Sequence, residues 1–175
     1  MKLHKSMIIV LIAIVCTLLL AAPALAATPL SSYEKQVAAL VNKQRAKFGL
    51  PQLRIHSRLV EAARVHSADM GQRQYFEHNS PSGETWSSRI VRCGYTRKGY
   101  RYWKAGENIY YGSGLYSSPL AVVRAWMKSP AHRAVILTRV FRDMGVGAVK
   151  TTNGFGSIDG TVWFFTLDLG RRIAQ

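Results

Sequence analysis

The order of the hydrophobic patterns in this 175-residue chain predicts a single domain of the α+β class. Before Phe141, apolar residues recur at three- and four-residue steps, which is the spacing of a helix with one buried face. After Phe141, β-branched and aromatic residues become dense, as they do in strands. Because helices precede strands, the pattern favours α+β over a wound parallel sheet, and the length suits one hydrophobic core.

The N-terminal segment, residues 1–26, is predicted to be a cleaved signal peptide. Lys2 and Lys5 precede an apolar run from Met7 to Leu20, and an Ala-Leu-Ala pattern closes the segment. The run is shorter than the roughly 20 apolar residues that a membrane-spanning helix needs. We therefore predict a mature domain of residues 27–175 that is secreted, either extracellular or periplasmic, and has no transmembrane segment.

Two long helices are predicted at the start of this domain. The first begins at Ser32, places Val37 and Val41 on one apolar stripe and ends at Gly49. Ser57 is expected to cap the second helix, whose apolar stripe consists of Leu59, Ala62, Ala63, His66 and Met70. The second helix is expected to pack on the first.

Three shorter helices are predicted further along the chain. One covers Thr85 to Cys93, while Ser118-Pro119 and Ser129-Pro130 each combine a cap residue with a first-turn proline. The stretch from Tyr95 to Lys104, which is rich in Tyr, Arg and Lys, has no clear period and is expected to be a loop.

Two strands complete the predicted fold. Met144 to Thr151 and Thr161 to Leu169 have strand composition, and the Gly- and Asn-rich piece from Thr152 to Gly160 joins them. An antiparallel sheet is therefore expected near the C-terminal end.

The formal net charge is +15, and removal of residues 1–26 would take away two lysines and no acidic residue, which leaves +13. A cationic exported domain favours anionic partners such as envelope polymers or lipid surfaces. Plain solubility is the alternative, since the basic residues are scattered, and no specific nucleic-acid motif is present. Only Cys93 would remain, so no intramolecular disulfide can form; we expect a buried thiol and a monomer.

The mature histidines divide into structural and functional candidates. His66 lies on an apolar stripe and is expected to be a core residue, while His56 precedes a cap and is expected at the surface. His78 and His132 lie in turn or cap signatures outside any apolar stripe. Those two are therefore the candidate site residues.

Gly106-Glu107-Asn108 adds a carboxylate to this set. A buried glutamate needs a charged or hydrogen-bonding partner, and a His-Glu-His cluster would supply one. Such a cluster could also bind zinc or another divalent cation at an open site. No local metal-binding spacing, nucleophile elbow or nucleotide-binding glycine motif occurs, so no recognisable enzyme class is indicated.

These motifs resemble the bacterial branch of the CAP superfamily, which comprises cysteine-rich secretory, antigen 5 and pathogenesis-related proteins. The similarity covers Val37 to Gly170 and is carried by four segments: Phe76-x-His78, Gly106-Glu107-Asn108-Ile109, Ala125-Trp126-Met127-x-Ser129-Pro130-x-His132-Arg133 and Met144-Gly145-Val146-Gly147. The resemblance implies a three-layer α-β-α sandwich with a small antiparallel sheet between helices and a central cavity.

The resemblance also implies a set of cavity residues. His78, Glu107 and His132 match three of the four His and acidic positions of the family, and they are the predicted metal ligands. The fourth, acidic position falls near Ser129 in this chain, and Asp143 is the nearest acidic residue in a cavity-adjacent motif. Asn108, beside Glu107, completes the predicted cavity set.

Three functional interpretations follow. The preferred one is a non-enzymatic binding module whose cavity receives a small ligand, a lipid or an anionic envelope component. The alternative is a metal-assisted hydrolase in which Glu107 is the general base for a water held by His78 and His132. In the third, the His and Glu side chains form a structural network and the basic surface carries the function.

Overall fold

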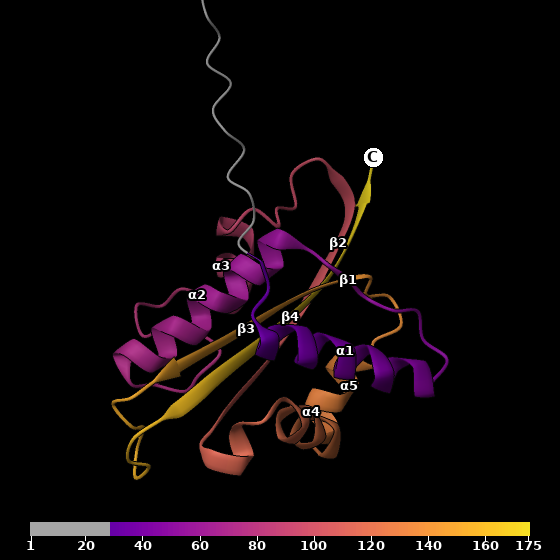
Figure 1. Ribbon diagram of the computed structural model, residues 1–175. Helices are drawn as coiled ribbons and strands as arrows, with labels where there is room; N and C mark the ends of the chain where they lie inside the picture. Colours follow the sequence, from indigo (N-terminus) through magenta and orange to yellow (C-terminus); the bar gives the residue numbers. More distant parts are fainter. Residues whose placement is uncertain (1–28) are drawn as a thin grey trace, which may run out of the picture.

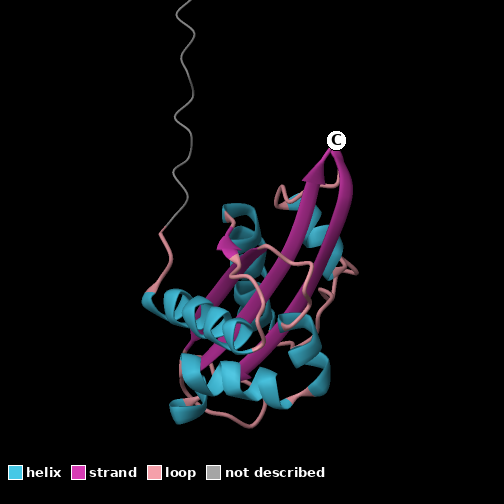
Figure 2. Ribbon diagram, turned by 90° about the vertical axis from the view of Figure 1, so that its right-hand side faces the viewer, coloured by secondary structure: helices cyan, strands magenta, loops and turns pink. Residues whose placement is uncertain are grey.

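The computed structural model describes residues 29–175, so the predicted signal peptide lies outside the described residues. A four-stranded sheet lies between two layers of helices (Figures 1 and 2). In chain order the elements are α1 (Ser32–Lys47), β1 (Arg54–Ile55), α2 (Ser57–Arg73), α3 (Trp86–Arg92), β2 (Tyr100–Gly112), the 3-10 turn η1 (Gly114–Ser117), α4 (Pro119–Lys128), α5 (Pro130–Ile136), β3 (Asp143–Thr151) and β4 (Val162–Ala174).

The α+β class is confirmed, but the sheet is mixed rather than purely antiparallel. Its strand order is β1-β3-β4-β2, with β2 and β3 antiparallel to β4 and the two-residue β1 parallel to β3. A strand as short as β1 has no readable period, so its pairing with β3 depends on tertiary contacts.

The expectation of a loop from Tyr95 to Lys104 is wrong from Tyr100 onward. Strand β2 begins there and pairs with β4 in an antiparallel ladder that ends at Gly112, with a register shift between Tyr100 and Tyr102. Basic and aromatic side chains occupy both faces of this part of β2, so the polar and apolar alternation that marks a strand is missing. The backbone ladder with β4, not the side-chain pattern, makes this segment a strand.

The expected packing of the second helix on the first is also wrong. The apolar stripe of α1 packs with α4 and α5 against one sheet face, where Val146, Phe165 and Leu167 are buried. Helix α2 covers the opposite face (Figure 1). Side chains alternate along a strand, so each face of the sheet has its own layer of helices.

Two glycines of β3 let α2 approach the sheet closely. A Cβ atom at Gly145 would overlap the backbone of Leu59, and one at Gly147 would overlap the carbonyl of Ala63. Just beyond, the buried hydroxyl of Ser67 donates to Thr166 Oγ1 at 2.9 Å. The close approach brings the middle of α2, including His66, down onto β4.

Helix boundaries follow local capping, with one correction. Ser31 and Glu34 form a capping box at α1, and the hydroxyl of Thr85 caps α3. Helix α2 already begins at Ser57, and its cap is His56, whose Nδ1 accepts from the backbone N–H of Arg58 at 3.2 Å. The expectation that Ser57 is the cap is therefore wrong by one residue. Cys93 is confirmed as a buried free thiol.

Candidate functional site

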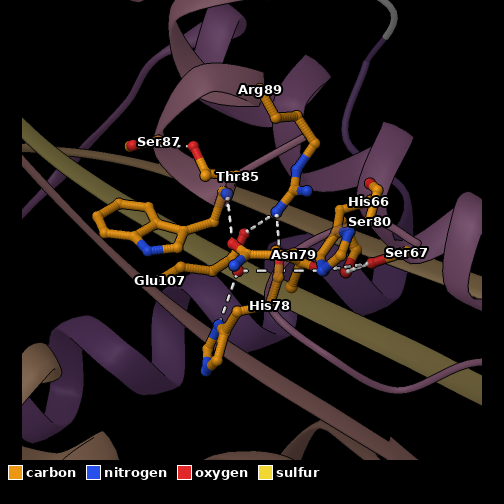
Figure 3. A network of polar contacts seen from close by, with 12 residues as sticks. His66, Ser67, His78, Asn79, Ser80, Thr85, Ser87, Arg89 and Glu107 are labelled. Carbon is orange, nitrogen blue, oxygen red and sulfur yellow. Dashed lines mark hydrogen bonds and ion pairs between the residues drawn. The ribbon is translucent and has the colours of Figure 1, made fainter. Parts of the chain in front are cut away.

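The carboxylate of Glu107 is the centre of a buried polar network (Figure 3). Its side chain is 1% exposed and points from β2 toward the layer that contains α2 and α3. His78 Nδ1 lies 2.8 Å from Oε1, and Arg89 Nη2 donates to Oε2 at 2.6 Å. Both carboxylate oxygens of Glu107 therefore accept a hydrogen bond from the protein itself.

Arg89 also fixes the loop that holds His78. The same Nη2 atom donates to the backbone carbonyl of His78 at 3.1 Å. Arg89 lies on α3, where it is 1% exposed. Asn79 Oδ1 accepts from the backbone N–H of Trp86 at 3.1 Å, which ties the loop to the first turn of the same helix. His78 is consequently held on both its side chain and its backbone.

His66 joins the network from α2. It is fully buried, as expected of a core residue, and its Nε2 atom donates to the backbone carbonyl of Glu77 at 3.0 Å. The same nitrogen lies 3.9 Å from Glu107 Oε1. Burial lowers the pKa of His66 to about 4, so its ring is neutral at pH 7.

Asp168 is the second carboxyl of the network, and the sequence did not single it out. It lies directly opposite Glu107 in the β2–β4 register and is fully buried. Burial, and then the charge of Glu107, raise the pKa of Asp168 well above its ordinary value. For Glu107, burial raises the pKa, but the hydrogen bond from His78 and the charge of Arg89 outweigh it and leave that pKa lowered. The buried carboxylate of Glu107 thus faces the buried cation of Arg89, and burial beside Glu107 favours the protonated form of Asp168.

His132 approaches from the other side of β2. Asn108 follows Glu107 in β2, so its side chain points to the opposite face of the sheet. Its Nδ2 atom donates to the backbone carbonyl of His132 at 3.0 Å, which anchors α5. The His132 ring is partly exposed, and its pKa is lowered by burial and by the charge of His78. The His132 backbone is therefore fixed to β2, and its ring lies close enough to His78 for that side chain to influence its pKa.

The other two predicted cavity residues lie elsewhere. Asp143, at the start of β3, accepts from Arg54 Nη2 at 2.9 Å and from the Tyr95 hydroxyl at 2.8 Å. Ser129 is the junction between α4 and α5, and its side chain makes no capping hydrogen bond. The structure therefore brings together His78 and Glu107 with His132 nearby, and it adds Arg89, His66 and Asp168 to them.

The predicted metal ligands do not fit a metal ion in this arrangement. Both oxygens of Glu107 already accept hydrogen bonds, and the guanidinium of Arg89 places a positive charge where a cation would have to approach. Within residues 29–175, no three His, Cys, Asp or Glu side chains are grouped so that they could hold a metal. No metal-dependent step follows from this site.

A hollow of about 410 Å³ lies beside the network, on the outer side of Arg89. It is bounded by α2, by the turn after His78 and by α3. Its lining residues are Val65, Ala68, Asp69, Gln72, Arg73, Ser80, Ser82, Glu84, Arg89 and Arg92. Arg73 and Arg92 are paired with Asp69 and Glu84, so the lining is polar but largely charge-compensated.

No helix within residues 29–175 has the length and apolar character needed to cross a membrane.

Two proteins of Bacillus subtilis (strain 168) are similar to this chain in sequence. The uncharacterized protein YkwD is 38% identical over 138 residues, which is 79% of this chain and 48% of YkwD. The uncharacterized membrane protein YlbC is 34% identical over 115 residues, which is 65% of this chain and 31% of YlbC. The chain thus spans less than half the length of the curated relatives it matches.

Solved structures share the fold. An extracellular protein of Bacillus anthracis that contains an SCP domain superposes with a TM-score of 0.61 at 28% identity, covering 82% of this chain and 44% of that one. An outer surface protein of Borrelia burgdorferi superposes with a TM-score of 0.63 at 22% identity, covering 79% of this chain and 91% of that one. The CAP model, described as the cysteine-rich secretory protein family, matches residues 38–169. The chain belongs to the CAP family of cysteine-rich secretory proteins.

Proposed function

We propose that this protein is an extracellular, non-enzymatic binding module that holds a small polar ligand between His78 and His132. The buried Glu107 and Arg89 side chains position His78 for that purpose. The observation that carries the proposal is the engagement of both Glu107 oxygens by His78 and Arg89, because it directs the carboxylate inward, away from any ligand.

This observation argues against Glu107 as a general base. A base must reach the proton that it removes through a free lone pair, at hydrogen-bond distance from the substrate. The side chain of Glu107 is 1% exposed, whereas that of His78 is 45% exposed. The group that can touch a ligand is therefore the imidazole, and the carboxylate orients it.

The chemistry of the two rings favours a ligand with hydroxyl or amide groups. When His78 is neutral and donates Nδ1–H to Glu107, its Nε2 is left as a hydrogen-bond acceptor. The lowered pKa of His132 keeps that ring neutral at pH 7. Imidazole nitrogens that donate or accept hydrogen bonds suit the hydroxyls of a glycan or of a polar lipid head group, which can do both.

The extracellular location rests on two observations. Solved structures with this fold include an extracellular protein and an outer surface protein. The predicted signal peptide at residues 1–26 would send the domain to the same place.

The test is a binding screen in which the NMR signals of the histidine imidazoles report binding. The purified secreted protein is titrated with neutral oligosaccharides and with short-chain glycerolipids while the imidazole NMR signals and the thermal midpoint are followed. We expect a bound probe to move the signals of His78 and His132, to leave that of the distant His56 in place and to raise the midpoint.

A His132→Gln variant distinguishes the binding function from the two alternatives, a hydrolase and a purely structural network. Because His132 is partly exposed, the substitution should leave the unliganded midpoint within about 2 °C of the parent while it weakens the probe at least about fivefold. Lys43→Gln, on the exposed side of α1, is the matched control. Turnover of a probe that His132→Gln abolishes would support the hydrolase instead, and a large fall in the midpoint would support a purely structural network.

A further inference from the structure

The outer end of the sheet is a two-stranded ribbon. Pairing between β3 and β4 stops at Asp143 and Gly170, but β2 and β4 stay paired from Lys104 and Arg171 onward to the end of the ladder. This part of the sheet projects beyond the helices, next to the C-terminal end of β4 (Figure 1). Arg101, Lys104 and Ala174 are exposed there, while Arg171 and Arg172 are partly buried.

The ribbon and the turn before it concentrate positive charge and contain no acidic side chain of their own. We call this surface the basic ribbon; its charged residues are Arg97, Lys98, Arg101, Lys104, Arg171 and Arg172. No acidic residue occurs in segments 96–106 and 169–175. None of the six cations has an ion-pair partner within the described part of the chain, although six other arginines of the domain do have one.

One pair within the ribbon is repulsive. Lys104 and Arg171 lie directly opposite each other in the antiparallel register. Like charges at such positions destabilise a sheet unless an anion lies between them. The arrangement therefore favours an external anion at this point.

Aromatic rings hold the arginines of the other face in place. The guanidinium of Arg97 lies 4.3 Å from the ring centre of Trp103, and that of Arg172 lies 4.2 Å from Tyr95 and 4.4 Å from Tyr100. An arginine whose guanidinium is already stacked on a ring loses less side-chain conformational entropy on binding an anion than an unstacked arginine does. Because cations already cover these rings, they are poor platforms for stacking nucleic-acid bases.

The surface also lacks the features of a lipid-inserting site. The large exposed apolar residues of the described chain are Phe48, Ile55, Val65, Leu115, Tyr116 and Leu120, and none of them belongs to the basic ribbon. A membrane-binding surface needs apolar side chains that enter the acyl region, in addition to its charge. A charged polymer without acyl chains is the better match.

We propose that the basic ribbon binds an extended phosphodiester polymer that has neither bases nor acyl chains, of the poly(glycerol phosphate) kind. Lys104 and Arg171 share one face of the ribbon, while Arg97 and Arg172 lie on the other, so the cations surround a narrow ribbon along which an extended polymer can lie. The forked guanidinium matches the two free oxygens of a phosphodiester. This interaction is separate from the ligand proposed at His78 and His132, and either can fail without the other.

The test uses poly(glycerol phosphate) and the purified secreted protein over a range of salt concentrations. We expect the triple variant Arg101→Gln, Lys104→Gln and Arg171→Gln to bind at least about tenfold more weakly. Its slope of log affinity against log salt should fall by about 2, because each lost phosphate contact contributes about 0.7 on a single strand. The thermal midpoint should not fall, because the substitutions remove the repulsion between Lys104 and Arg171.

The matched control removes the same charge from α1, where Lys35→Gln, Lys43→Gln and Lys47→Gln change three exposed residues. This variant should bind the polymer within about threefold of the parent, since only long-range attraction is reduced. Equal weakening in the two triple variants would overturn the proposal, because it would mean diffuse attraction by net charge. Tighter binding, dependent on the basic ribbon, to a single-stranded oligonucleotide or to phosphatidylglycerol vesicles would overturn the chemistry proposed for the partner.

Discussion

Strand β2 carries charge in two contrasting environments. At Glu107 the charges are buried and compensated: its carboxylate faces the guanidinium of Arg89, while burial lowers the pKa of His66 to about 4 and raises that of Asp168. A few residues earlier, Arg101 and Lys104 are exposed, and neither has an ion-pair partner within residues 29–175. Desolvation explains the difference, because an unpaired charge is strongly unfavourable inside a protein and nearly free of penalty in water.

The comparison separates what each region can do. The network around Glu107 restricts the position of His78 and the loop that carries it, so it suits a site that needs fixed geometry. The basic ribbon leaves its charge available to solvent and to anions. Stability should therefore respond mainly to changes in the network, and binding of polyanions mainly to changes in the ribbon.

The largest expected effect is on the network. Glu107→Gln should lower the free energy of unfolding by about 3–5 kcal/mol, because it leaves Arg89 buried without its counter-charge. Glu61→Gln, which breaks the exposed pair with Arg58, should lower it by only about 0–1 kcal/mol. Urea unfolding of both variants measures the difference. Equal losses in the free energy of unfolding would show that the buried pair contributes no more to stability than the exposed pair.

The next effect is a dependence of stability on pH that arises from His66. In the folded state the pKa of His66 is lowered to about 4, whereas its ordinary value is 6.5. Between these values the unfolded chain binds the extra proton, so stability falls as the pH decreases from about 6.5 to 4. The loss from this group is about 3 kcal/mol.

A His66→Gln variant isolates this contribution, since the other titrating groups are common to both proteins. The difference in unfolding free energy between parent and variant should shrink as the pH is lowered from 7 to 4. A difference that stays constant across this range would mean that His66 has a nearly ordinary pKa. Chemical denaturation at several pH values is the measurement.

The smallest expected effect is on the basic ribbon. Lys104→Gln removes one of two like charges that face each other across the β2–β4 ladder. We expect the free energy of unfolding to rise by about 0.2–1 kcal/mol at low salt, with the gain fading at high salt. Lys43→Gln on α1 should change it by less than about 0.5 kcal/mol. A loss of stability at Lys104 would mean that this side chain contributes packing that outweighs the repulsion.

Part of the site was accessible from the sequence, and part was not. His78, Glu107 and His132 could be selected because they lie in motifs that resemble those of a family. Arg89 and Asp168 could not, because an arginine on a short helix and an aspartate in a strand have no local feature that marks them as partners of Glu107. Asp143 was selected for its motif, yet it bonds to Arg54 and Tyr95.

The sequence by itself determined the helices, and their limits to within about a residue, since periodicity and capping act within a few residues, as at Ser31 and Thr85. It also determined the α+β class and the unbalanced positive charge. Only the tertiary structure decided that Tyr100–Lys104 is a strand, that α1 and α2 lie on opposite faces of the sheet and that Asp168 lies opposite Glu107. These features depend on which distant segments pair and in which register, and that is settled by burial over the whole domain rather than by neighbours in the chain.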